Sequence, residues 1–207
     1  MTEPVPVTGV AQVGRDRVRV MTGLTTRAGR PYLCGPALTC ACVPEDNLAM
    51  HVALYQATPG TVLVCDATGT TRCALFGELM ATDALNQGVA GLIVQGPIRD
   101  IADIGELGFP VWCTGTAPGQ AAKVTVVSVG LPVVVGGVLV ASGDQVIADR
   151  DGVAVVPAAG WPAIQAEVAA LAAKEERTRA RLAAGERLAD INGLELSRFL
   201  PRSNSQA

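Results

Sequence analysis

The chain has 207 residues, of which 49% are hydrophobic and 17% charged, so it is a folded protein and not a disordered one. The net charge is -3 and aromatic residues make up 3%, which excludes a strongly basic or base-stacking nucleic-acid surface. The first ten residues lack a basic segment followed by an apolar run, and glycine and proline interrupt the most apolar stretch, residues 124–140. We therefore expect one cytoplasmic domain over residues 1–207, with no signal peptide, membrane partner or nucleic-acid partner.

Cysteine and histidine usage does not indicate a zinc site. No Cys-x-x-Cys pair occurs, and His51 is the only histidine. We interpret His51 as a structural residue of an amphipathic helix. We interpret the cysteines as small buried residues in a reduced compartment. They are Cys34, Cys40, Cys42, Cys65, Cys73 and Cys113.

The first half of the chain predicts alternating strands and helices. Residues 1–30 are polar and interrupted by glycine, so we expect an irregular N-terminal arm. Residues 31–43 favour β-structure, broken by a turn at Gly35-Pro36. Asp46 or Asn47 is expected to begin the first helix. Helices are predicted at 48–57, 77–86 and 100–107, and strands at 61–65, 89–94 and 111–113. This alternation is typical of βαβ units with a parallel sheet, in an α/β fold.

The second half predicts a different arrangement. From residue 124 strand follows strand, with hairpin turns at Gly136-Gly137 and at residues 149–152, so this part is expected to be antiparallel. A C-terminal segment, residues 161–207, begins with a long helix over residues 161–184. The charged distal half of that helix is either a solvated face or an arm that reaches a neighbouring subunit.

Two charged positions in the middle of the chain predict a binding site. Glu78 begins a helix, and Arg99-Asp100 follows an apolar strand, with twenty residues between Glu78 and Arg99. The free N–H groups at Gly77 to Met80 suit a carboxylate or phosphate. An arginine and an aspartate at a strand's carboxyl end suit an anion and a Mg²⁺ ion.

Simpler interpretations of the same residues stay open. Glu78 also serves as a favourable charge in the first turn of an ordinary helix. Arg99 and Asp100 also make an exposed ion pair, worth about 0–1 kcal/mol. Asp66 ends the preceding strand and belongs either to the same rim or to a cap of the following loop.

The run ALFGELMATDALNQGVAGLIVQGPIRDIADIGELGFPVW resembles the RraA-like family, as do PEDNLAMHVAL, PGTVLVCD and SGDQVIADRDGVAVVP. That family includes class II 4-hydroxy-4-methyl-2-oxoglutarate/4-carboxy-4-hydroxy-2-oxoadipate aldolases and regulators of ribonuclease activity. The similarity covers about residues 35–157 and, more weakly, KEERTRARLAAGE. It implies a layered α/β/β/α sandwich that assembles as trimers or hexamers, with sites between subunits.

The resemblance also implies roles for the residues of the acid-X20-Arg-Asp signature. Asp100 would bind Mg²⁺ or Mn²⁺ directly, whereas Glu78 and a neighbouring subunit's Glu175 would act through water. Arg99 and the amides of Gly77, Glu78, Leu79 and Met80 would hold a pyruvyl carboxylate and keto oxygen. Those are the groups of a small 2-oxo acid substrate.

The implied activity is cleavage of a 4-hydroxy-2-oxo acid to pyruvate, with oxaloacetate decarboxylation as a side activity. Arg99 would stabilise the enolate, and a water steered by Glu78 would move the proton. The alternatives are a non-catalytic regulator that binds an RNA-processing protein, or a biosynthetic lyase for another oxo or hydroxy acid. Gln95 and Pro97 depart from the family pattern, so we expect them to alter specificity.

Overall fold

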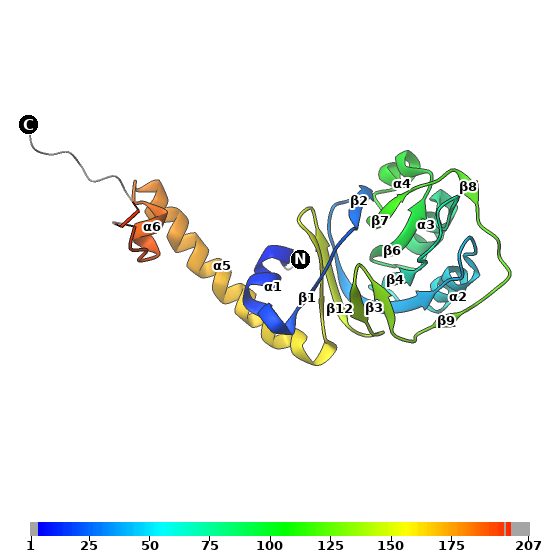
Figure 1. The fold of residues 1–207 in the computed structure, drawn as a ribbon, viewed down its shortest axis with the longest axis horizontal. Coiled ribbons are helices and arrows are strands. Elements are labelled where there is room, and N and C mark those ends of the chain that lie inside the picture. The colour runs from blue at the N-terminus through cyan, green and yellow to red at the C-terminus, as the bar shows by residue number, and fades with distance from the viewer. Residues whose placement is uncertain (1–3, 197, 200–207) are drawn as a thin grey trace, which may run out of the picture.

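The structure, a computed structural model, describes residues 4–196 and 198–199. The end of the expected C-terminal tail therefore lies outside the described residues. Figure 1 shows a compact body of strands and helices, from which the long C-terminal helix projects. Within the described residues, no helix is both long and apolar enough to cross a membrane.

The elements follow one another along the chain as helices, strands and two short 3-10 turns. The helices are α1 (Val7–Gly14), α2 (Leu48–Gln56), α3 (Glu78–Asn86), α4 (Ile101–Leu107), α5 (Trp161–Ala183) and α6 (Leu188–Ile191). The strands of the first half are β1 (Arg19–Met21), β2 (Thr25–Ala28), β3 (Leu33–Ala41), β4 (Val62–Asp66), β5 (Cys73–Ala74), β6 (Gly91–Ile98) and β7 (Val111–Thr116). Those of the second half are β8 (Gly119–Gln120), β9 (Ser128–Val129), β10 (Val133–Val135), β11 (Val138–Val140), β12 (Gln145–Asp149) and β13 (Gly152–Val156).

A nine-stranded mixed sheet runs in the order β1-β13-β12-β3-β4-β6-β7-β2, with β9 beside β3. Its centre, β3-β4-β6-β7, is parallel, as the alternation of strands and helices predicted. The predicted hairpins are also confirmed, since β10 pairs with β11 and β12 with β13 in antiparallel register. The fold therefore combines a parallel βαβ part with an antiparallel part.

The curled sheet packs helices against its outer face and the β10–β11 hairpin against its inner face. Along β4, Leu63 and Cys65 pack into the core that α2, α3 and α4 cover, whereas Val62 and Val64 pack against the β10–β11 hairpin. This alternation is the period-two pattern of a strand buried on both faces. Helices α1 and α5 cover the antiparallel part (Figure 1). The predicted layered α/β/β/α sandwich is confirmed.

Three expectations about local structure were wrong. Residues 1–30 are not an irregular arm, because α1 packs on α5 through the buried Val10, β1 pairs with β13, and β2 pairs with β7. The Gly35-Pro36 pair does not turn, because β3 runs through it; a Cβ on Gly35 would lie 2.1 Å from the Gly60 carbonyl oxygen. The strand predicted at 89–94 was wrong in its bounds, because β6 runs from Gly91 to Ile98. In each case pairing with distant strands overrides the local signal.

Helix α5 is anchored only in its first half. Ile164 and Val168 are buried, and no residue of α5 beyond Val168 is. The remainder leaves the body and ends near α6 (Figure 1). The charged half that the sequence predicted is therefore exposed in the single chain.

Candidate functional site

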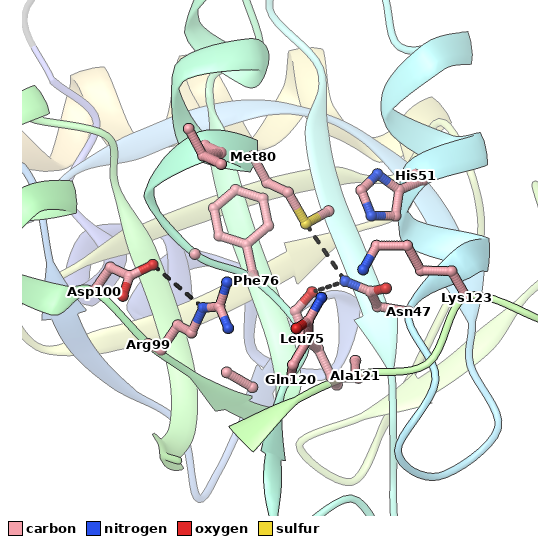
Figure 2. A pocket seen from close by; sticks show the side chains of 13 residues that line it. Asn47, His51, Leu75, Phe76, Met80, Arg99, Asp100, Gln120, Ala121 and Lys123 are labelled. Atoms are coloured by element: carbon pink, nitrogen blue, oxygen red, sulfur yellow. Dashed lines mark hydrogen bonds and ion pairs between the residues drawn. The ribbon is translucent and has the colours of Figure 1, made fainter. Parts of the chain in front are cut away.

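A cavity of about 190 Å³ lies beside the end of β6 (Figure 2). It is smaller than the sites that hold drug-sized ligands, so it suits a small organic acid. Its position matches the rule that open α/β sheets bind ligands at the carboxyl ends of their strands. The lining residues are Asn47, His51, Ala74, Leu75, Phe76, Gly77, Leu79, Met80, Arg99, Asp100, Gln120, Ala121 and Lys123.

The start of α3 and the residues after β6 meet, which is the condition for the site that the sequence suggested. The Arg99 Nε atom lies 3.3 Å from Asp100 Oδ2, and the backbone N–H of Glu78 donates to the same oxygen at 3.2 Å. Backbone bonds hold the two segments together: the Arg99 amide donates to the Phe76 carbonyl at 3.0 Å. Arg99 and Asp100 are each somewhat more than one-third exposed, so they are accessible from the cavity.

Gly77 makes this close approach possible. Its backbone is extended, so conformational freedom is not the reason for a glycine. A Cβ at this position would lie 2.6 Å from Asp100 Oδ2 and 3.1 Å from Arg99 Nε. Any larger residue therefore has to push the ion pair away from the helix start.

Asp100 has a strained backbone. It has φ 55° and ψ 40°, a left-handed conformation that a non-glycine residue adopts at a cost of about 1–3 kcal/mol. Its side chain makes no capping bond at the start of α4, although Asp100 is the N-cap residue. The carboxylate points back to the start of α3 instead. Strain of this kind, held by the surrounding structure, often occurs at binding sites.

The first turn of α3 supplies free amide donors. The first helical hydrogen bond runs from the Ala81 N–H to the Gly77 carbonyl at 3.0 Å. The amides of Leu79 and Met80 precede it, so they have no acceptor within the helix. The Glu78 amide is already used by Asp100. The backbone amides of Leu79 and Met80 are therefore free to bind an anion, whereas the Glu78 amide is occupied.

The Glu78 carboxylate does not line the cavity. One of its oxygens accepts a hydrogen bond from the Thr82 hydroxyl at 2.9 Å, and the residue lines a separate hollow with Asp103 and Glu106. Glu175 lies on α5, where it pairs with Arg179 at 3.3 Å, outside both hollows. Its expected role depends on a neighbouring subunit and stays a prediction.

A divalent cation fits this donor set only with water as the main ligand. No cluster of three or more His, Cys, Asp and Glu side chains suitable for a metal occurs within residues 4–196 and 198–199. Asp100 supplies one carboxylate at the cavity and Glu78 a second close by. Mg²⁺ is usually held by one or two carboxylates with several waters, so the residues fit the ion that the sequence predicted.

Several cavity residues were missed by sequence reasoning. Asn47 and His51 come from the start of α2, and Gln120 and Lys123 from β8 and the loop after it (Figure 2). Nothing local in the sequence distinguishes them, because the sheet topology brings α2 beside β6. His51 was interpreted as purely structural, yet it lines the cavity.

Other predicted candidates have structural roles. Asp66 caps the following loop, since its Oδ1 accepts bonds from the Thr68 amide and hydroxyl. Gln95 lies outside the cavity and joins that loop to the β10–β11 turn through Thr68 and the Gly136 amide. Five cysteines are buried, Cys34 is partly buried, and all six are free thiols, as expected.

Comparison with known proteins identifies the family. A Halalkalibacterium halodurans protein named "Putative 4-hydroxy-4-methyl-2-oxoglutarate aldolase" is 40% identical over 123 residues, 59% of each chain. An Alkalilimnicola ehrlichii protein of the same name is 33% identical over 73% of this chain and 94% of its own. The crystal structure of Streptomyces coelicolor RraAS2, described as an unusual member of the RNase ES inhibitor RraA family, is 31% identical. It has a TM-score of 0.73 and covers 86% of this chain and 91% of its own. The RraA-like family model, described as Aldolase/RraA, matches residues 10–155, and the protein therefore belongs to the RraA-like family.

Proposed function

We propose that the protein is a divalent-metal-dependent lyase that cleaves a 4-hydroxy-2-oxo acid and releases pyruvate. One observation carries the proposal. A guanidinium, a carboxylate and the free amides of a helix start converge on a cavity the size of a small acid. Relatives named as aldolases support this reaction class.

The donors of the cavity suit a pyruvyl group. The Leu79 and Met80 amides and the positive end of the α3 dipole favour a carboxylate. The Arg99 guanidinium reaches Asp100 through Nε, so its two terminal nitrogens are the donors available for a planar carboxylate or keto oxygen. A 2-oxo carboxylate has these acceptors on adjacent carbons.

Mg²⁺ or Mn²⁺ would be held by Asp100 directly and by Glu78 through water, with Glu175 of a neighbouring copy completing the site in a trimer or hexamer. When bound, the cation supplies Lewis-acid polarisation of the 2-oxo group. The oligomer and the contribution of Glu175 belong to the proposal. The exposed distal half of α5 supports them, because it is free to reach a second subunit.

The chain's own residues then act on charge that develops during cleavage. A water molecule in the cavity takes the proton of the 4-hydroxyl and supplies the proton that C3 later receives. The C3–C4 bond breaks, and its electron pair forms the enolate of pyruvate while C4 becomes a carbonyl. Arg99 stabilises the enolate oxygen, and a proton returned to C3 gives pyruvate. Oxaloacetate decarboxylation passes through the same enolate, so it is expected as a side activity.

A pyruvate-release assay over a panel of 4-hydroxy-2-oxo acids, with and without Mg²⁺, tests the proposal. We expect turnover that EDTA abolishes and added Mg²⁺ restores. We also expect Asp100→Ala to remove turnover while circular dichroism shows a folded protein. Full activity in EDTA, or in the Asp100→Ala variant, would refute the metal-dependent reaction.

A regulatory function is the second candidate, favoured by the similarity to Streptomyces coelicolor RraAS2. In this case the protein binds an RNA-processing enzyme and needs no turnover. A pull-down with a ribonuclease of the RNase E class tests it. Retention of the ribonuclease by both the wild type and Asp100→Ala, without pyruvate release by either, would support regulation over catalysis.

A further inference from the structure

Two polar atoms in the cavity wall have no hydrogen-bond partner. Among the described residues, Asn47 Oδ1 and His51 Nε2 are the buried side-chain nitrogen or oxygen atoms in this condition. Both residues line the cavity that contains Arg99 and Asp100. An unpaired buried polar atom costs about 1–3 kcal/mol, and native structures pair most such atoms. Two such atoms in one cavity wall indicate a ligand group that forms the missing hydrogen bonds.

The orientation of Asn47 shows which kind of atom is missing. Asn47 is 5% exposed, and its Nδ2 donates to the Leu75 carbonyl at 2.7 Å. The donor end of the amide is therefore fixed on the main chain, and Oδ1 is left as an acceptor. A carboxylate has no proton to give to this atom. The missing partner has to be a donor, such as a hydroxyl.

His51 is placed to complete the same group. Asn47 is the N-cap residue of α2, and the His51 amide donates to its carbonyl at 3.3 Å, so the two residues stand one turn apart at the same end of the helix. Burial and the nearby Lys123 lower the pKa of His51, and the opposing effect of Asp83 is weaker. A neutral imidazole has one N–H and one acceptor nitrogen. With the proton on Nε2, His51 is a donor beside the Asn47 acceptor.

The Lys123 side chain passes between the labelled His51 and Asn47 in Figure 2. Lys123 is an exposed residue with a flexible side chain, so it can move aside when a ligand enters. Glu78, the residue first expected to steer the proton of the 4-hydroxyl, does not line this cavity.

We propose that Asn47 and His51 recognise the substrate's 4-hydroxyl, with His51 Nε2–H donating a hydrogen bond to its oxygen and Asn47 Oδ1 accepting a hydrogen bond from its O–H group. One hydroxyl has one donor and one accepting oxygen, so it completes both atoms. The proposal rests on the proposed lyase function and adds a specificity determinant to it. Asn47 and His51 would therefore select 2-oxo acids that carry a hydroxyl on C4, the carbon that leaves when the C3–C4 bond breaks. A site with buried polar groups discriminates strongly against an analogue that cannot pair them.

Two reactions of the same enolate separate this role from a structural one. Retro-aldol cleavage of 4-hydroxy-4-methyl-2-oxoglutarate uses the hydroxyl, whereas oxaloacetate decarboxylation has none. With Mg²⁺ present, we expect His51→Leu to lower kcat/KM for the hydroxy acid about 10–100-fold, the equivalent of losing a buried hydrogen bond. Decarboxylation should fall by a clearly smaller factor, because the C4 carboxylate of oxaloacetate accepts from His51 but has no proton for Asn47 Oδ1. His51→Gln carries an amide N–H and should recover most of the lost cleavage.

Tyr55→Leu is the matched control, because Tyr55 is on the same helix and 92% exposed. It should leave both reactions unchanged. A parallel loss of both reactions in His51→Leu would show a structural role and overturn the proposal. So would unchanged cleavage, or a His51→Gln variant as impaired as His51→Leu.

If the wild type releases no pyruvate, the lyase function is refuted. A binding measurement still tests the hydroxyl site in that case. Calorimetry compares 2-hydroxyglutarate with glutarate, which differ only in the hydroxyl. We expect the wild type to prefer the hydroxy acid by about tenfold and His51→Leu to lose this preference. Equal affinity of the wild type for the two acids would overturn the hydroxyl site.

Discussion

Gly77→Ala is the substitution that tests the geometry of the site most directly. The added Cβ would lie 2.6 Å from Asp100 Oδ2, closer than real Cβ contacts come, and 3.1 Å from Arg99 Nε, which is a tight contact. The backbone is extended here, so alanine itself is allowed. The strain is relieved by moving the two side chains, since both are partly exposed. The variant should therefore fold but hold its ion pair in the wrong place.

The displacement needed is several tenths of an ångström to about 1 Å, and misplacement of catalytic groups by about 1 Å can cost about 100-fold in rate. This corresponds to about 2.7 kcal/mol of activation free energy. Loss of a favourable glycine N-cap adds up to about 1 kcal/mol of destabilisation. We expect kcat/KM for Mg²⁺-dependent pyruvate release to fall about 100-fold, with only a small fall in Tm.

Gly105→Ala is the control, because a Cβ at Gly105, inside α4, meets no atom within 4 Å. Alanine is the better helix residue, so this variant should be as active as the wild type and slightly more stable. A folded Gly77→Ala protein with wild-type turnover would refute the view that the contact of Gly77 with Arg99 and Asp100 positions the reacting groups. Equal losses in both variants would also contradict it.

Three further predictions follow from individual contacts. In differential scanning fluorimetry we expect Mg²⁺ to raise the Tm of the wild type and to leave the Tm of Asp100→Asn unchanged. Hydrogen bonds to the Glu45 carboxylate, the largest effect from the Cys73 thiol and smaller ones from the Thr71 and Arg72 amides, lower the pKa of Glu45 to about 2 from its ordinary 4.5. Its carboxylate therefore stabilises the fold above about pH 4.5, and this contribution is lost as the pH falls towards 2. In urea titrations Glu45→Gln should be less stable than the wild type at pH 7, by a margin that shrinks in acid. Ile164→Ala, at a fully buried anchor of α5, should lower the free energy of unfolding by about 2–5 kcal/mol; a loss under 1 kcal/mol would contradict the anchoring role.

The sequence alone determined most of the elements that build the site. The helix from Glu78 and the strand before Arg99 follow from short-range signals, because periodicity and turn chemistry act within a few residues. The same signals place Arg99-Asp100 at a strand end, where parallel sheets bind ligands. The resemblance to a family then correctly indicated the layered sandwich.

The tertiary structure decided what depends on segments distant in sequence. Residues 1–30 look irregular, yet β1 and β2 form because β13 and β7 offer edges to pair with. The Glu78 carboxylate accepts a hydrogen bond from Thr82 and lines a hollow with Asp103 and Glu106 of α4, outside the cavity. Asn47 and His51 share a cavity with Arg99 only because parallel pairing places β4 between β6 and β3, the strand that precedes α2. No local pattern encodes such a meeting, since it arises from the packing of whole elements.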